Sequence, residues 1–218
     1  ILLALITYFK VRHQIGLFGY PLLQILTASI IAISKDDLKA RLAYSTISQL
    51  SYIILGAALA TTFALKGASF HIITHAAGKI TLFFCAGAIY ITAHVKKISE
   101  LGGLGFKTPM IFFAYTLAAL SIIGVPPLIG SWSKLFLVIG SLEADFLFVA
   151  VLLGISSLLN IYYLLQPVFI AFNKKNIKNL NITKAPLTVW PPVITGVGCF
   201  FLFFFSNYFL KIINGVVA

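Results

Sequence analysis

The sequence has few charged residues and very few acidic ones. Only 10% of its 218 residues are charged and 60% are hydrophobic, whereas about 25% of a soluble domain is charged. Five residues are Asp or Glu and sixteen are Lys or Arg, which gives a net charge of +11. This composition excludes a soluble globular domain. It predicts an all-α polytopic membrane protein whose helices lie in a lipid bilayer.

Cysteine is also scarce, and no cysteine lies in a metal-binding or redox motif. Cys85 and Cys199 lie in separate apolar runs without CxxC spacing, so we expect buried thiols and no metal or cofactor. The basic surplus does not indicate nucleic acid, because the basic residues stand singly or in small groups between apolar runs. There they act as topology signals, and we expect no nucleic-acid partner.

Apolar runs divide the chain into membrane-crossing segments. They cover residues 1–9, 16–34, 42–62, 67–93, 110–142, 146–172 and 187–210. We predict one transmembrane domain over residues 1–218. Residues 1–14 hold the end of a truncated span, 15–172 a five-helix repeat, and 173–218 a cytoplasmic loop and the final span. The apolar run is already under way at Ile1, which predicts a fragment of a longer chain. Asp36 or Asp37 is expected to cap the helix that follows.

The segment 110–142 is too long for one straight crossing and too short for two with a turn. Gly124, Pro126 and Pro127 lie in its middle, and proline removes a backbone donor and opens a helix. We therefore predict one discontinuous helix that crosses once. A single crossing gathers ten basic residues on one side, which the positive-inside rule places in the cytoplasm. These ten are Lys35, Lys39, Arg41, Lys96, Lys97, Lys107, Lys174, Lys175, Lys178 and Lys184.

A file of titratable residues lies in the apolar run 67–93. His71, His75 and Lys79 are spaced four apart, so they share one helix face over a rise of about 12 Å. A lysine in mid-membrane costs about 2.5–3.5 kcal/mol on insertion scales, and removal from water favours the neutral form of an amine. With Lys134, just beyond the break, this file predicts a proton relay along the membrane normal.

Other interpretations of these residues stay open. Lys134 could snorkel to the interface or pair with carbonyls freed at the break. Either histidine could serve merely as a hydrogen-bond partner between helices, and Lys79 could be structural. His71 and His75 could also bind zinc, although no further ligand is evident. The small and polar residues between 44 and 52 fit helix packing or a hydrated path. No predicted span contains an acidic residue, so any partner carboxylate must come from elsewhere.

Three ordered motifs resemble those of one family. They are residues 35–52, the His71-x3-His75-x3-Lys79 file, and the block 124–134. Together they resemble the antiporter-like subunits L, M and N of NADH:quinone oxidoreductase (complex I) and of Mrp-type sodium/proton antiporters. Residues 78–90 are more similar to the D-type proteins of Mrp antiporters. The resemblance implies two inverted five-helix repeats, of which this chain would hold the second. It also implies that Lys79, His71 and His75 are relay residues and that Lys134 is the ionisable residue of the second broken helix.

The resemblance therefore implies a cation/proton antiporter subunit of the Mrp D type, a transporter subunit rather than an enzyme. The alternatives are a proton-pumping subunit of complex I without its own redox centre, or a structural fragment that transports nothing. The expected partners are other membrane subunits, the lipid bilayer and protons, with Na⁺ as a candidate. A bacterial inner membrane is favoured over a mitochondrial one.

Overall fold

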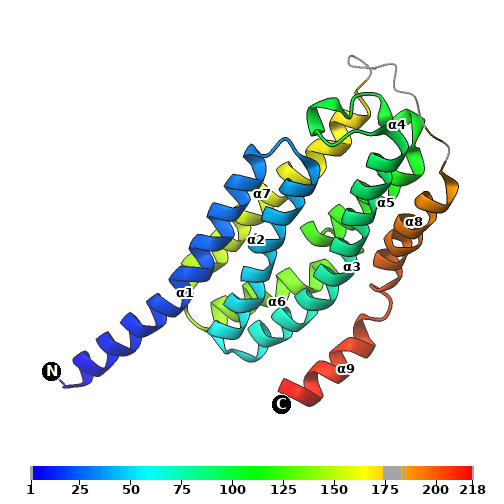
Figure 1. Cartoon of the computed structure of the whole chain (residues 1–218). Helices are drawn as coiled ribbons and strands as arrows, with labels where there is room; N and C mark the ends of the chain where they lie inside the picture. Colours follow the sequence, from blue (N-terminus) through cyan, green and yellow to red (C-terminus); the bar gives the residue numbers. More distant parts are fainter. Residues whose placement is uncertain (1, 174–182, 184, 218) are drawn as a thin grey trace.

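The computed structural model describes residues 2–173, 183 and 185–217. Within this part of the chain the fold is helical, without a strand (Figure 1). The elements are α1 (Leu2–Ser34), α2 (Leu38–Leu59), α3 (Thr62–Ala93), the 3₁₀ turn η1 (Ile98–Glu100), α4 (Leu104–Lys107), α5 (Pro109–Ile123), α6 (Gly130–Glu143), α7 (Leu147–Ala171), α8 (Pro186–Phe201) and α9 (Ser206–Val217). The predicted all-α membrane architecture is confirmed. Among the described residues, four apolar stretches are long enough to span a bilayer: Leu38–Leu59, Thr62–Ala93, Leu147–Ala171 and Pro186–Gly215.

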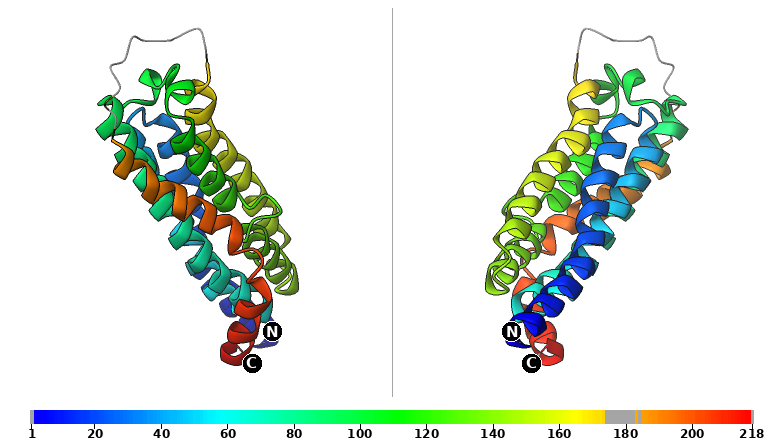
Figure 2. Two further views of the ribbon diagram at one scale, coloured as in Figure 1. Left: turned by 90° about the vertical axis from the view of Figure 1, so that its right-hand side faces the viewer. Right: turned by 90° about the vertical axis from the view of Figure 1, so that its left-hand side faces the viewer.

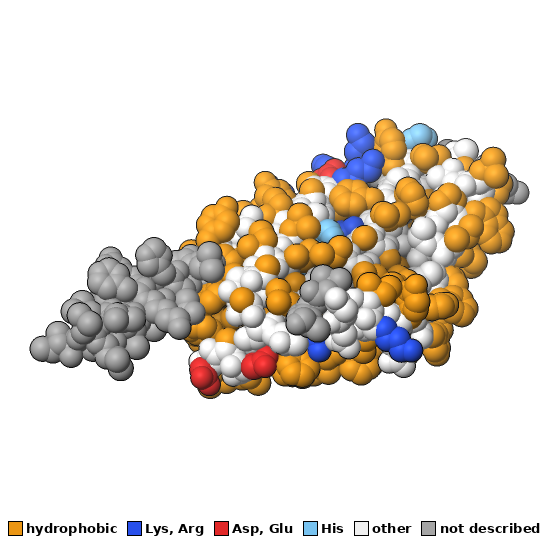
Figure 3. All heavy atoms as spheres, turned by 90° about the horizontal axis from the view of Figure 1, so that it is seen from below, with side chains coloured by type: hydrophobic (Ala, Val, Ile, Leu, Met, Phe, Trp, Pro, Cys, Tyr) orange, Lys and Arg blue, Asp and Glu red, His pale blue; other side chains and the backbone are white. Residues whose placement is uncertain are grey.

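The long helices form an elongated bundle around α3 (Figures 1 and 2). This helix contacts α2, α5, α6 and α8. The outer surface is largely hydrophobic, and in the view of Figure 3 basic and acidic side chains occupy only a few places. Exposed apolar residues such as Leu158 and Phe169 point away from the core, as expected for helices that face lipid tails.

The predicted break in segment 110–142 is confirmed. α5 ends at Ile123, and Gly124 adopts a φ of 90°, a left-handed conformation that glycine reaches without a Cβ penalty. The Gly124 N–H donates to the carbonyl of Leu120 at 2.9 Å, which closes the end of α5. The Pro126–Pro127 peptide bond is cis, and α6 begins at Gly130.

The broken segment crosses the bundle once. α5 begins near the start of α8, whereas α6 ends at the opposite end beside the turn between α2 and α3 (Figure 1). There the Thr61 hydroxyl donates to the carbonyl of Gly140 at 3.0 Å. One crossing is the arrangement that the count of positive charges favours.

Helix boundaries differ from the prediction at both ends of the chain. The expected interruption after residue 9 is wrong, because α1 continues to Ser34. Lys10 and Arg12 are good helix formers and do not stop a helix. The final crossing, predicted over 187–210, lies within the apolar stretch Pro186–Gly215, but a turn divides this stretch into α8 and α9. This turn allows Ile213 of α9 to pack with Phe70, Ile129 and Phe136.

Two helix starts follow from side-chain caps. Asp37 caps α2 as predicted, accepting a hydrogen bond from the Ala40 N–H at 2.8 Å. α3 begins at Thr62, five residues before the predicted start, because the Thr61 hydroxyl accepts from the Ala64 N–H at 3.2 Å. The added residues carry Lys66, which lies between the predicted apolar runs 42–62 and 67–93.

Gly130 sets how closely the two halves of the broken helix approach each other. A Cβ atom at Gly130 would lie 1.8 Å from the carbonyl oxygen of Ser121 and 3.1 Å from the Thr74 side chain. The first turn of α6 therefore lies directly on the last turn of α5 and on α3. Only glycine fits this approach.

We predict that Gly130→Ala destabilises the protein by about 1–3 kcal/mol, the usual cost of forcing a methyl group into a packed site. The midpoint of thermal unfolding in detergent should fall accordingly. Gly154→Ala is the matched control, because a Cβ at Gly154 meets no atom within 4 Å. Equal midpoints for the two variants would contradict this account of the break.

Candidate functional site

His71, His75 and Lys79 form one file on α3, facing α2 and α6. His71 is 1% exposed and Lys79 is 6% exposed, and the two imidazole rings stack with centroids 6.3 Å apart. His71 Nδ1 lies 2.8 Å from the hydroxyl of Ser133 on α6. Helical spacing therefore brings the three residues together as predicted.

The Lys79 amine is held by neutral oxygen atoms of α2. Its Nζ donates to the carbonyl of Leu42 at 3.1 Å and to the Ser45 hydroxyl. No carboxylate forms an ion pair with Lys79 in the described part of the chain. Hydrogen bonds alone therefore compensate the buried amine for the loss of water.

Lys134 enters the bundle from α6 and reaches α7. Its Nζ donates to the Ser157 hydroxyl at 3.1 Å and lies 5.4 Å from the centre of the Tyr52 ring. The aliphatic part of the side chain passes Gly124, where a Cβ atom would lie 3.1 Å from Lys134 Cδ. The helix break therefore gives this side chain its space.

A chain of hydrogen bonds between α2 and α7 occupies the space between the two lysines. The Tyr52 hydroxyl donates to Ser156 at 2.7 Å, and Asn160 Nδ2 lies 3.5 Å from the same hydroxyl. The Tyr163 hydroxyl donates to Asn160 Oδ1 at 2.5 Å, and Gln49 Nε2 donates to Tyr163 at 3.4 Å. All five residues are buried.

Asn160 links this chain to Lys134. With its carboxamide turned over, its nitrogen donates to the Tyr163 hydroxyl at 2.5 Å, and its oxygen accepts from Lys134 Nζ at 3.0 Å and from Gln49 Nε2 at 3.1 Å. These bonds replace the two bonds of Asn160 to Tyr52 and Tyr163 given above. Gln49 lies one helical turn after Ser45, which contacts Lys79. Side chains therefore connect Lys134 to within one turn of the Lys79 site.

The polar residues that α7 contributes to the hydrogen-bonded chain were not predicted from the sequence. Ser156, Asn160 and Tyr163 are spaced four and three apart in an otherwise apolar helix, which places them on one face. That polar stripe was the available signal. For the residues between 44 and 52, the sequence did not decide between helix packing and the lining of a hydrated path. Gln49 and Tyr52 belong to the hydrogen-bonded chain, whereas Ser48 bonds to Ser29 of α1 and so contributes to packing.

Arg41 was counted among the basic residues between the membrane spans, but it lies within helix α2. It lies in the first turn of α2 and is 4% exposed. Its guanidinium donates to the carbonyls of Lys35 at 2.9 Å and Ile33 at 3.1 Å, at the end of α1. A cation is stabilised there by the unpaired carbonyls and the helix dipole.

The same guanidinium reaches α7 at Pro167. It donates to the Gln166 side chain at 2.5 Å and lies 3.5 Å from the carbonyl of Tyr163. Pro167 has no N–H for the carbonyl four residues earlier, which is that of Tyr163. Arg41 therefore joins α1, α2 and α7 by meeting acceptors that the helices leave unpaired. This arrangement indicates a structural role.

Some buried polar atoms of the site have no hydrogen-bond partner among the described residues. They are the Nε2 atoms of His71 and His75 and the Oε1 atom of Gln49. The two histidines have no third metal ligand nearby in the described chain, where no cluster of three or more such residues occurs.

These features define a class: a membrane helix bundle with a discontinuous helix and two lysine amines held inside it. The family described as NADH:quinone oxidoreductase/Mrp antiporter, transmembrane, matches residues 2–160. The chain belongs to this family, as the three sequence motifs indicated.

Relatives and solved structures come from both branches of the family. The chain is 44% identical to NADH-quinone oxidoreductase subunit N of Desulforudis audaxviator over 69% of its length, and 33% identical to subunit L of Mycobacterium tuberculosis over 81%. It covers only 30% and 29% of those proteins. It therefore spans less than a third of the curated relatives that it matches.

The fold matches chains of two kinds of assembly. The Mrp complex of Dietzia sp. gives a TM-score of 0.84 at 21% identity, over 96% of this chain and 47% of that chain. Respiratory complex I of Thermus thermophilus gives 0.82 at 21% identity, over 95% and 44%. At this level of identity the match establishes a shared fold and no more.

Proposed function

We propose that this chain supplies one proton-translocating repeat of a multisubunit cation/proton antiporter of the Mrp type. The observation that carries the proposal is a pair of lysine amines inside an apolar bundle, Lys79 and Lys134, with a chain of buried hydroxyl and carboxamide groups between them. Burial of an amine narrows the free-energy gap between its charged and neutral forms. Such a group can take up and release a proton where a surface lysine would stay charged.

The geometry suggests a route for the proton within the repeat. The stacked His71 and His75 lead along α3 toward Lys79, while Tyr52 and Asn160 lead across the bundle toward Lys134. The hydroxyl groups of Tyr52 and Tyr163 can each donate and accept a hydrogen bond. A proton could therefore pass between neighbouring groups as the hydroxyls reorient. The described residues hold part of such a path, and other membrane subunits would complete it.

The second candidate is a proton-pumping subunit of NADH:quinone oxidoreductase. The 44% identity to subunit N favours it, whereas the sequence of residues 78–90, which resembles the D-type proteins of Mrp antiporters, favours the first. Affinity purification of the full-length protein from native membranes distinguishes them. Co-purifying flavin and iron–sulfur subunits would select the complex I assembly, and their absence with other antiporter subunits present would select the Mrp assembly. A non-transporting fragment would purify without either set.

Lys79→Ala in the full-length protein should abolish cation exchange driven by a pH gradient while membrane insertion stays intact. The substitution removes the protonatable amine at the contact between α2 and α3. The measurement is cation-dependent collapse of the gradient in inverted vesicles, with Lys66→Ala as the control because Lys66 lies outside the hydrogen-bonded chain. Transport at the wild-type rate in Lys79→Ala would count against the relay.

Lys134→Ala should also cause a large loss of transport, on the order of a hundredfold, the lower range for removing a positioned proton-transfer group. The same vesicle assay measures it, at matched protein level. Retained activity would assign Lys134 to packing against Tyr52 and Ser157 rather than to the relay.

Asn160→Leu keeps the side-chain shape but removes the carboxamide, which bonds to Tyr163 and, depending on its orientation, to Tyr52 or Lys134. Loss of a hydrogen bond of about 1–1.5 kcal/mol in the path should slow transport about tenfold. Ser157→Ala serves as the comparison, because it removes one contact to Lys134 and leaves the chain itself in place. Equal rates in wild type and Asn160→Leu would show that protons bypass α7.

A further inference from the structure

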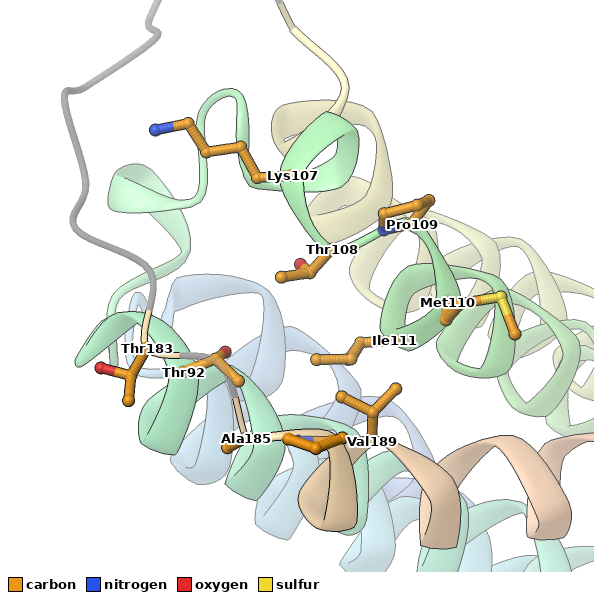
Figure 4. A pocket seen from close by; sticks show the side chains of 10 residues that line it. Thr92, Lys107, Thr108, Pro109, Met110, Ile111, Thr183, Ala185 and Val189 are labelled. Atoms are coloured by element: carbon orange, nitrogen blue, oxygen red, sulfur yellow. The ribbon is translucent and has the colours of Figure 1, made fainter.

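The cavity at the end of the bundle where α3, α5 and α8 meet holds about 360 Å³ and has a largely apolar lining (Figure 4). Two of its threonine hydroxyls are already engaged within their own helices. Thr92 donates to the carbonyl of Ala88 at 2.7 Å, and Thr108 donates to that of Leu104 at 3.0 Å. A fully buried side chain with an unpartnered polar atom lies elsewhere, inside the bundle, at Nε2 of His71.

The backbones of α3 and α6 lie in contact at Gly67, one turn before His71. A Cβ atom at Gly67 would lie 2.7 Å from the backbone nitrogen of Leu137 and 3.0 Å from the carbonyl oxygen of Ser133. Because the two helices approach so closely, the short side chain of Ser133 reaches across to α3. Its fully buried hydroxyl lies 3.2 Å from the Gly67 carbonyl and 2.8 Å from His71 Nδ1.

The Ser133 hydroxyl has one hydrogen for these two neighbours. The Gly67 carbonyl can only accept, so a hydroxyl that donates to it must accept its second bond from His71 Nδ1–H. This arrangement forms both bonds and puts the proton of the neutral ring on Nδ1. The opposite arrangement, in which the hydroxyl donates to Nδ1, forms only one bond and leaves an N–H at the unpartnered Nε2, where a buried donor without an acceptor is costly.

Neighbouring rings hold the plane of the His71 imidazole. Tyr52 of α2 stacks on it with centroids 5.3 Å apart and an angle of 19° between the ring planes. His75 stacks on it with centroids 6.3 Å apart. Stacking fixes the plane of the ring but does not distinguish its two edges. The Ser133 hydroxyl makes that distinction, because it holds Nδ1 toward α6.

We propose that Ser133 is a positioning residue that keeps a proton on His71 Nδ1 and leaves Nε2 as the atom at which His71 takes up and releases a proton. The inference deepens the proposed function and rests on it where it makes His71 a relay residue. When a proton adds to the Nε2 lone pair, Nδ1–H still donates to Ser133 and the hydroxyl still donates to Gly67. The bond from the charged ring is the stronger one. The ring therefore changes its charge without a change of partners at Nδ1.

The test is nuclear magnetic resonance of the full-length protein in lipid bilayers, with histidine labelled by ¹³C and ¹⁵N. Protonated and unprotonated ring nitrogens give separate resonances, and Nδ1 is identified by its bond to Cγ. The resonances that disappear in His71→Gln are those of His71. In the neutral wild-type ring we expect the proton on Nδ1. Ser133→Ala should shift the ratio of the two neutral forms about tenfold toward Nε2–H, the effect of losing one hydrogen bond.

Two further variants separate hydrogen bonding from packing. Ser133→Cys keeps the side-chain shape but offers only a weak acceptor, so the ratio should shift in the same direction as in Ser133→Ala. Ser131→Ala is the matched control, because the Ser131 hydroxyl donates to the carbonyl of Leu128 at 2.8 Å and the ratio should stay unchanged. Size-exclusion chromatography reports folding, and Ser133→Cys keeps the test valid if Ser133→Ala does not fold.

A proton on Nε2 in the neutral wild-type ring, or one ratio shared by wild type and the Ser133 variants, would overturn the proposal. The spectra need no pH gradient, so this outcome does not depend on transport. Cation exchange in inverted vesicles separates the inference from the proposed function, and Ser133→Ala should slow it about tenfold. A shifted ratio with wild-type exchange would uphold the role of Ser133 and overturn that of His71 in the relay. Slowed exchange with an unshifted ratio would overturn the role of Ser133.

Discussion

Hydrocarbon offers no hydrogen-bond partners, and this constraint governs the whole bundle: each polar group within it must be satisfied by protein. The break between α5 and α6 shows how the constraint is met. Gly124 closes α5 in a left-handed conformation, and Gly130 allows the next half-helix to begin against the carbonyl of Ser121. The end of α5 and the start of α6 therefore meet inside the protein, beside Thr74 of α3.

The same constraint separates two kinds of buried cation. Arg41 meets four oxygen acceptors at helix ends and at a proline, and a guanidinium stays charged under all working conditions. Its role is to hold α1, α2 and α7 together. Lys79 and Lys134 each have few neutral partners and lie next to groups that both donate and accept. In the proposed relay, these amines change their charge without disrupting contacts that hold the helices together.

Periodicity and composition were sufficient to predict the helical bundle, the single crossing of the broken segment and the file on α3. A titratable residue in an apolar run stands out in sequence, and spacing by four fixes its face. The roles of residues that depend on contacts with another helix were not predicted from the sequence. Asn160 and Tyr163 gain significance only when α7 packs against α2. Arg41 was placed in a loop because a charged residue beside a turn resembles a topology signal. Its burial depends on acceptors from Ile33 and Gln166, which lie on other helices.

The charges inside the bundle also bear on the proposed function of the repeat. Among the described residues, the buried charged side chains are Arg41 and Lys79, and no Asp or Glu is buried. In the proposed relay, Lys79 and the partly buried Lys134 would each pass through a charged state. Each charged state raises the free energy of the interior unless an opposite charge approaches. The described helices hold no such group, and this chain covers only 30% and 29% of the two curated relatives. An acidic residue that faces Lys79 or Lys134 from the rest of the chain or from another subunit would lower this cost. Its movement or protonation would then set which lysine holds the proton.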